Sequence, residues 1–140
     1  MGNETTQPVL FEGNILEEVA DYKYLEIDFN RNLSWDGCRK KRTLGGWKAF
    51  YAFQNRCREA ELWDWKTTLT LFGLLMIPVI FYGCELWASS TTEIQWKQIE
   101  KIQKRLITNK FKIKSAVPYA ILLSETGAAP IEAKIGRAHV

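Results

Sequence analysis

The chain has 140 residues, of which 46% are hydrophobic and 25% charged, and its formal net charge is +3. This length suits one domain with its own core, and the composition excludes a disordered tail, a collagen-like chain and a low-complexity repeat. Aromatic residues make up 13% of the chain and include six Trp. Because most of these Trp fall on apolar stripes, we expect them to pack in the core and at helix junctions and not to stack on nucleic-acid bases.

The basic residues are concentrated in two blocks of the sequence. Residues 39–58 contain seven Lys or Arg and no acid, and residues 97–114 contain seven more with a single Glu. Concentrated bases indicate a polyanionic partner, whereas the alternative interpretation is a solvated helix face without a ligand. The two blocks are therefore the first candidates for a binding surface.

The sequence contains no recognisable catalytic constellation. Cys38, Cys57 and Cys84 lack the spacing of a metal site, His139 is the only histidine, and neither a phosphate-binding glycine loop nor an adjacent Asp pair occurs. These absences argue against a zinc site, a Ser-His or Cys-His nucleophile and a two-metal centre, so we expect no cofactor in this chain. Scattered thiols and the lack of an apolar leader favour an intracellular protein of the cytoplasm or nucleus.

Two features raise the question of a membrane. Residues 1–6 match the N-myristoylation pattern, although one acyl chain would anchor the protein only marginally. Residues 67–84 carry no charge, but their apolar part is interrupted by Pro78 and is shorter than the roughly 20 residues that a span needs. We therefore expect a buried core helix here and no membrane partner.

The N-terminal part of the chain predicts a small antiparallel β element. Residues 9–11 and 15–19 flank turn residues and predict a hairpin. Residues 22–29 alternate between two faces and predict one continuous strand.

The first long helix is predicted over residues 34–60, with Ser34 as its N-cap. Its apolar stripe consists of Gly46, Phe50, Phe53 and Cys57. A glycine inside a helix costs about 1 kcal/mol, so we expect another element to approach closely at Gly45 and Gly46.

Three further helices are predicted. Residues 65–82 form an apolar helix that Asp64 caps and that Pro78 kinks or ends, and residues 119–125 form a short helix closed by Gly127. Between them, a helix over residues 93–110 is capped by Thr91 or Thr92. Its apolar stripe consists of Trp96, Ile99, Ile102 and Leu106, and its basic stripe consists of Lys97, Lys101, Lys104 and Arg105.

The expected fold class is mainly α, with a short N-terminal antiparallel β hairpin in residues 1–33 and a three- to four-helix bundle in residues 34–133. Residues 134–140 show neither a helical nor a strand period, and a back-translation of residues 135–140 resembles a sequencing adapter. We expect this tail to be a non-native addition outside the fold.

Ordered blocks over about residues 9–133 resemble the reverse transcriptases of non-LTR, LINE-type retrotransposons. YKYLEIDF at 22–29 is similar to the family's primer-grip strand, which reads roughly F/Y-K-Y-L-G-I. The segment Arg42 to Cys57, which begins with RTLGGWKA, resembles its R-x-x-x-G-W-K-A helix. Leu71-Phe72 together with PVIFYGCELW at 78–87 resembles its P-V-L-L-Y-G-C-E-x-W block. WKQIEKIQKRL at 96–106 is similar to its W-x-x-I-E-K-I-Q-K-R-F helix, and a further block covers residues 118–132.

The resemblance implies the primer-grip strand and the helical thumb of such an enzyme. The family's palm, whose paired aspartates hold divalent metal such as Mg²⁺, has no counterpart in these blocks, so we expect this chain to be inactive alone. The primer-grip-like positions implied are Tyr24, Leu25, Glu26 and Ile27. Glu26 stands where the family has Gly, and a carboxylate there would repel phosphate.

A thumb holds the template–primer duplex through backbone phosphates without reading base sequence. The expected partners are therefore an RNA–DNA or DNA duplex and the missing palm. The phosphate-binding residues predicted on the two basic helices are Arg39, Lys40, Arg42, Lys97, Lys101, Lys104 and Arg105.

Two alternatives stay open at this point. One is a basic helical module that docks on a protein or a membrane surface through residues 67–84. The other is the transcript of a degenerate element that has no function.

Overall fold

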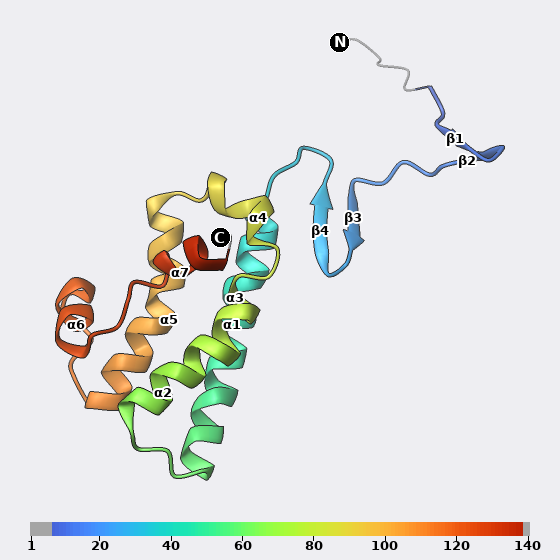
Figure 1. Cartoon of the computed structure of the whole chain (residues 1–140). Coiled ribbons are helices and arrows are strands. Elements are labelled where there is room, and N and C mark those ends of the chain that lie inside the picture. The colour runs from blue at the N-terminus through green and yellow to red at the C-terminus, as the bar shows by residue number, and fades with distance from the viewer. Residues whose placement is uncertain (1–6, 139–140) are drawn as a thin grey trace. The chain divides into compact units, whose positions relative to one another are not determined.

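The computed structural model describes residues 7–138 and divides the chain into two compact units, Met1–Ser34 and Trp35–Val140 (Figure 1). The myristoylation pattern at residues 1–6 and the single histidine, His139, lie outside the described residues. The mainly α class with an N-terminal β element is confirmed.

The N-terminal unit consists of two short antiparallel hairpins. β1 (Leu10–Phe11) pairs with β2 (Asn14–Ile15), as expected from the turn residues between them. β3 (Asp21–Tyr24) pairs with β4 (Ile27–Asn30).

The prediction of one continuous strand over residues 22–29 is wrong. Tyr24 pairs with Ile27, so Leu25 and Glu26 form a two-residue loop between two strands. Leu25 has φ 49° and Glu26 has φ 62°, the left-handed backbone that a tight hairpin loop requires at both positions. The reversal also leaves Leu25 67% exposed.

The helical unit begins with α1 (Asp36–Glu59), which confirms the first long helix. Its N-cap is Trp35, without a side-chain hydrogen bond, and not Ser34 as expected. The predicted stripe faces the core: Gly46, Phe50 and Phe53 are buried, and Cys57 is half-buried.

Gly46 marks the crossing of α1 with α3 and α5. A Cβ atom on Gly46 would lie 2.9 Å from Ile102 Cδ1 and 3.0 Å from Ile80 Cγ1, whereas a Cβ on Gly45 would meet nothing within 4 Å. The expected close approach is therefore confirmed at Gly46 and not at Gly45.

The second helical segment is divided into three parts. α2 (Trp65–Leu71) continues into η1 (Phe72–Met76), a π-helical turn, and then into α3 (Ile77–Ile80). Asp64 caps α2 as predicted, because its carboxylate accepts a hydrogen bond from the Thr67 N–H at 2.8 Å. The wider π turn ends at Met76, two residues before Pro78, which has no N–H to continue the α-helical ladder.

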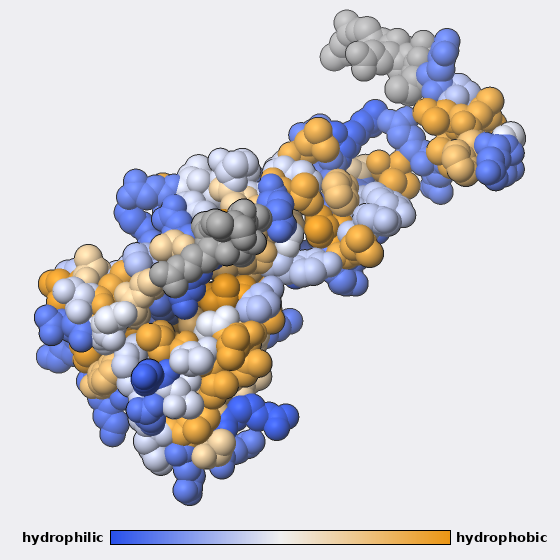
Figure 2. Space-filling view, viewed as in Figure 1, coloured by the Kyte–Doolittle hydropathy of each residue, from blue (hydrophilic) through white to orange (hydrophobic). Residues whose placement is uncertain are grey.

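This segment is buried on one side only, so the prediction of a helix surrounded by core is wrong. Phe72, Met76 and Ile80 are buried against the rest of the helical unit, but Leu74 is 66% and Leu75 57% exposed. Hydrophobic residues gather on the surface along α2, η1 and α3 (Figure 2). The physical reason is that α1 packs along one side of the segment, and no described element of this unit covers the opposite side.

α4 (Cys84–Trp87) and η2 (Ala88–Ser90) lead into α5 (Glu93–Phe111). The prediction of a helix that Thr92 caps is confirmed, and Gln95 completes a capping box with it. Ile99, Ile102 and Leu106 of the predicted stripe are buried, and Trp96 is half-buried.

The chain closes with α6 (Tyr119–Thr126), which ends at Gly127 with φ 71°, as expected, and with α7 (Ala133–Ala138). The prediction that residues from 134 onward lack regular structure is wrong as far as Ala138. Lys134 Nζ lies 5.7 Å from the centre of the buried Phe72 ring, so the tail begins in contact with the core.

Candidate nucleic-acid interface

Arg39 is not available to a phosphate in this structure. It is only 8% exposed, and its Nη1 donates to the Trp87 carbonyl at 3.3 Å and to Ser90 Oγ at 2.9 Å. Its Nη2 forms an ion pair with Asp36. The guanidinium therefore ties α1 to the α4–η2 segment, and its burial is a correction to the predicted binding set.

Arg42 is also engaged within the helical unit. Its guanidinium carbon lies 5.0 Å from the centre of the Tyr82 ring, a cation–π arrangement. The residue is half-buried. Arg42 therefore contributes to packing between α1 and the chain after α3.

Lys40 lies at a groove between α1 and α5. The groove has a volume of about 630 Å³ and is lined partly by polar side chains. Among its lining residues are Lys40, Thr43, Leu44, Trp47, Gln98 and Ile99. We call it the α1–α5 groove. Lys40 is exposed at this groove, so the structure keeps it in the candidate surface.

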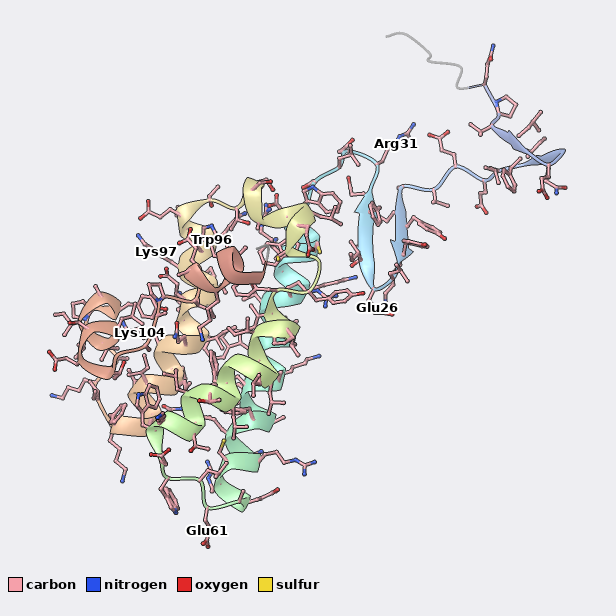
Figure 3. All side chains as sticks on the ribbon, viewed as in Figure 1. Glu26, Arg31, Glu61, Trp96, Lys97 and Lys104 are labelled. Carbon is pink, nitrogen blue, oxygen red and sulfur yellow. The ribbon has the colours of Figure 1, made fainter. Side chains whose placement is uncertain are left out.

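The four bases predicted on α5 reach solvent to different degrees. Lys97, Lys101 and Arg105 are exposed, and Lys104 is half-buried. Lys97 and Lys104 extend from the side of α5 away from α1 (Figure 3). Lys101 Nζ donates to Gln98 Oε1 at 3.3 Å, which places it beside the α1–α5 groove.

The acidic side chains near these bases are few, and two of them, Glu93 and Asp36, are paired with a basic side chain. Glu93 pairs with Lys97 at 3.1 Å. Burial, reinforced by the nearby Glu132 carboxylate, raises the pKa of Glu100. Asp36 at the groove is paired with Arg39 and also accepts from Gln95 Nε2 at 3.1 Å. The field along α5 is therefore positive where Lys101 and Arg105 are exposed.

The primer-grip-like residues form a hairpin tip. Tyr24 ends β3, Leu25 and Glu26 form the loop, and Ile27 begins β4. Glu26 is exposed and pairs with Lys23 at 2.7 Å. A carboxylate therefore occupies the tip, where the resemblance implies a glycine.

Sequence reasoning missed an aromatic pair on α1. Trp47 and Tyr51 stack, with ring centroids 6.1 Å apart and an interplanar angle of 30°. Tyr51 is 54% exposed and Trp47 is half-buried at the α1–α5 groove. The expectation that Trp residues pack in the core and at helix junctions suits Trp87, which is fully buried, but Trp63 is 73% exposed and Trp47 is only half-buried. The missed signal is the helical spacing of Trp47 and Tyr51 from Lys40.

Residues 7–138 match neither the pattern of a metal-ligand group nor that of a single membrane-spanning helix. Over this range, no group of three or more His, Cys, Asp or Glu residues could hold a metal ion. Within the same range, no single helix has both the length and the apolar character needed to cross a bilayer. The helices Trp65–Ile80 and Cys84–Ser90, bent by 64°, meet that requirement only when they are taken together.

Comparisons with known proteins identify no relative. No family model matches the chain, and neither the curated proteins nor the solved structures include a significant match.

Proposed function

We propose that the helical unit holds a nucleic-acid duplex by its backbone phosphates, in the manner of the thumb of a non-LTR retrotransposon reverse transcriptase. The observation that carries this proposal is the exposed basic side of α5. Lys97, Lys101 and Arg105 are exposed there, and Lys104 is partly so. At 1.5 Å per residue they cover about 12 Å of helix, on the order of three to four base-pair steps.

The proposed phosphate-binding set differs from the one expected from the sequence. Arg39 is left out because its guanidinium is buried and hydrogen-bonded. Arg42 is left out because its guanidinium lies over the Tyr82 ring. The set that we propose is Lys40, Lys97, Lys101, Lys104 and Arg105. Cationic side chains on a helix surface fix the position of a duplex without reading its sequence, as a polymerase thumb must.

The proposal gives this chain no catalytic step. Its partners would be an RNA–DNA or DNA duplex and a palm that carries the paired aspartates and their Mg²⁺. Binding is therefore the activity to measure.

The test is the salt dependence of binding to a short fluorescein-labelled RNA–DNA hybrid, followed by anisotropy with the full chain. Each phosphate contact is expected to add about −0.9 to the slope of log affinity against log salt. Lys101→Glu should weaken binding and reduce the slope by about 1, whereas Lys66→Glu on α2 should change neither. An affinity that does not change with salt would overturn the proposal.

One observation favours a second candidate, a docking module for a protein or membrane surface. Leu74 and Leu75 of η1 and Val79 of α3 are 66%, 57% and 38% exposed. A group of exposed apolar side chains on a folded protein is typical of a surface that contacts another protein or a membrane. Flotation with vesicles that contain anionic lipid tests the membrane form: binding that Leu75→Gln abolishes, without binding to the hybrid, would favour it.

A further inference from the structure

An aromatic surface that the core does not require adjoins the α1–α5 groove: Trp47 lines the groove, and Tyr51 stacks on Trp47. Phe50, on the core side of α1, is fully buried, whereas Tyr51 beside it is 54% exposed. Trp47 contacts Phe50 edge-on, with centroids 5.8 Å apart, and stacks on Tyr51. The Trp47 indole therefore packs against the buried Phe50 ring on one side and against the exposed Tyr51 ring on the other.

The groove beside this pair has the dimensions and the polarity of a small-ligand site. Its volume of about 630 Å³ lies within the usual range for ligand pockets. Thr43 and Gln98 line it and supply a hydroxyl and an amide, the groups that hydrogen-bond the edges of bases. The apolar side chains of Leu44 and Ile99 complete the wall.

The charges around the groove suit an anion. Lys40 lines it from α1, and Lys101 adjoins it from α5 through its hydrogen bond to Gln98. Among the described lining residues Asp36 is the only acid, and Arg39 and Gln95 both bind its carboxylate. The negative charge of Asp36 is therefore balanced locally and does not oppose a phosphate between the two lysines.

We infer that the α1–α5 groove binds an unpaired nucleotide at a single-stranded extension of the duplex. Its base stacks on the outer face of the Trp47–Tyr51 pair, and its phosphate lies between Lys40 and Lys101. Inside a duplex, base faces are already covered by neighbouring base pairs, so an aromatic surface recognises unpaired bases. This inference rests on the proposed function, because α5 carries bases for both the duplex and the extension.

The experiment compares a blunt RNA–DNA hybrid with the same hybrid that carries a short unpaired extension. Anisotropy with the full chain at one salt concentration should give about tenfold tighter binding to the extended hybrid, the effect of one stacked base. Tyr51→Leu and Trp47→Leu should remove this preference, and Trp47→Phe should retain it because the ring is kept. Trp63→Leu is the matched control, because Trp63 is 73% exposed and lies outside the α1–α5 groove.

The outcomes separate this inference from the proposed function. Equal affinity for both hybrids overturns the stacking inference and leaves the proposal of duplex binding intact. Binding of the unpaired strand alone overturns the proposal of duplex binding and supports base stacking at the α1–α5 groove. Loss of the preference in Trp63→Leu overturns the assigned location, and no binding to any of the three overturns both. Circular dichroism reports whether Trp47→Leu is folded; the exposed Tyr51→Leu decides the result if it is not.

Discussion

The backbone of Gly46 approaches Ile102 so closely that a Cβ atom there would lie 2.9 Å from the Ile102 Cδ1 methyl. Ile102 is fully buried and belongs to the apolar stripe of α5. The glycine therefore sets the distance between the helix that carries Trp47 and the helix that carries Lys101. The position of the α1–α5 groove depends on this crossing.

Gly46→Ala should destabilise the protein although alanine is the better helix former. The new methyl would overlap Ile102 and Ile80, and overpacking of a core costs about 1–3 kcal/mol. Gly45→Ala is the matched control, since its methyl meets nothing within 4 Å and should stabilise α1 by up to about 1 kcal/mol. Urea unfolding measures both. Equal stability of the two variants would contradict the close crossing.

Arg39 and Lys40 are neighbours in sequence with opposite expected roles. Arg39→Met keeps an apolar stem but loses the bonds to Trp87, Ser90 and Asp36, so the free energy of unfolding should fall by about 2 kcal/mol. Lys40→Met at the exposed neighbour should change stability by less than about 0.5 kcal/mol and should weaken hybrid binding. Urea unfolding and anisotropy on the same samples separate the two effects. A stable Arg39→Met protein that no longer binds the hybrid would show that Arg39 contacts phosphate.

Tyr119 joins α6 to a buried amide on α5. Its hydroxyl donates to Gln103 Oε1 at 2.5 Å and accepts from the Ile131 N–H at 3.3 Å. Gln103 is fully buried. Tyr119→Phe leaves both partners unpaired and should cost about 1–3 kcal/mol, measured by urea unfolding near neutral pH. Tyr22→Phe, at a 60% exposed side chain, should cost almost nothing.

The same phenol predicts a dependence on alkaline pH. Burial raises the pKa of Tyr119 from 10.0 to about 12, and the Glu100 charge adds to this effect. Because the pKa is higher in the folded state, the protonated phenol contributes its full stabilisation below pH 10 and loses it as the pH rises toward 12. The stability difference between wild type and Tyr119→Phe should therefore shrink over that window. A constant difference would contradict the burial of the phenol.

The long helices could be predicted because several local signals agree. In α5 the capping residue Thr92, the apolar stripe and the basic stripe all indicate the same element, and the structure confirms the helix and its cap. Charge pattern, in contrast, does not report burial. Arg39 and Lys40 are adjacent in one basic block, yet only the fold shows that Arg39 lies against the Trp87 carbonyl.

Alternating residues also leave a specific ambiguity. A strand and a hairpin with a two-residue loop carry the same alternation when the loop residues are not Gly, Asn or Asp. Leu25 and Glu26 give no such signal, so residues 22–29 resemble one strand in the sequence. The exposure of Tyr51 could not be predicted from the sequence for a similar reason, because an aromatic residue next to Phe50 is equally typical of a core.

The hairpin loop leads to a prediction about Glu26. Its φ of 62° lies in the left-handed region, which costs an L-residue about 1–2 kcal/mol and costs glycine little. The ion pair with Lys23 offsets little of this cost, because both side chains are more than half exposed. Glu26→Gly, which places at this position the glycine of the pattern that residues 22–29 resemble, should therefore stabilise pairing between β3 and β4. Slower amide hydrogen exchange in these two strands of the full chain would show it.

Asp28→Gly is the matched control for this prediction. Asp28 lies within β4, opposite Lys23, and its φ is not in the left-handed region. Glycine at a strand position adds conformational entropy to the unfolded chain without relieving strain, so exchange in β3 and β4 should become faster. If Glu26→Gly speeds exchange as Asp28→Gly does, residues 22–29 do not turn at Leu25 and Glu26, and the single strand would be the better description.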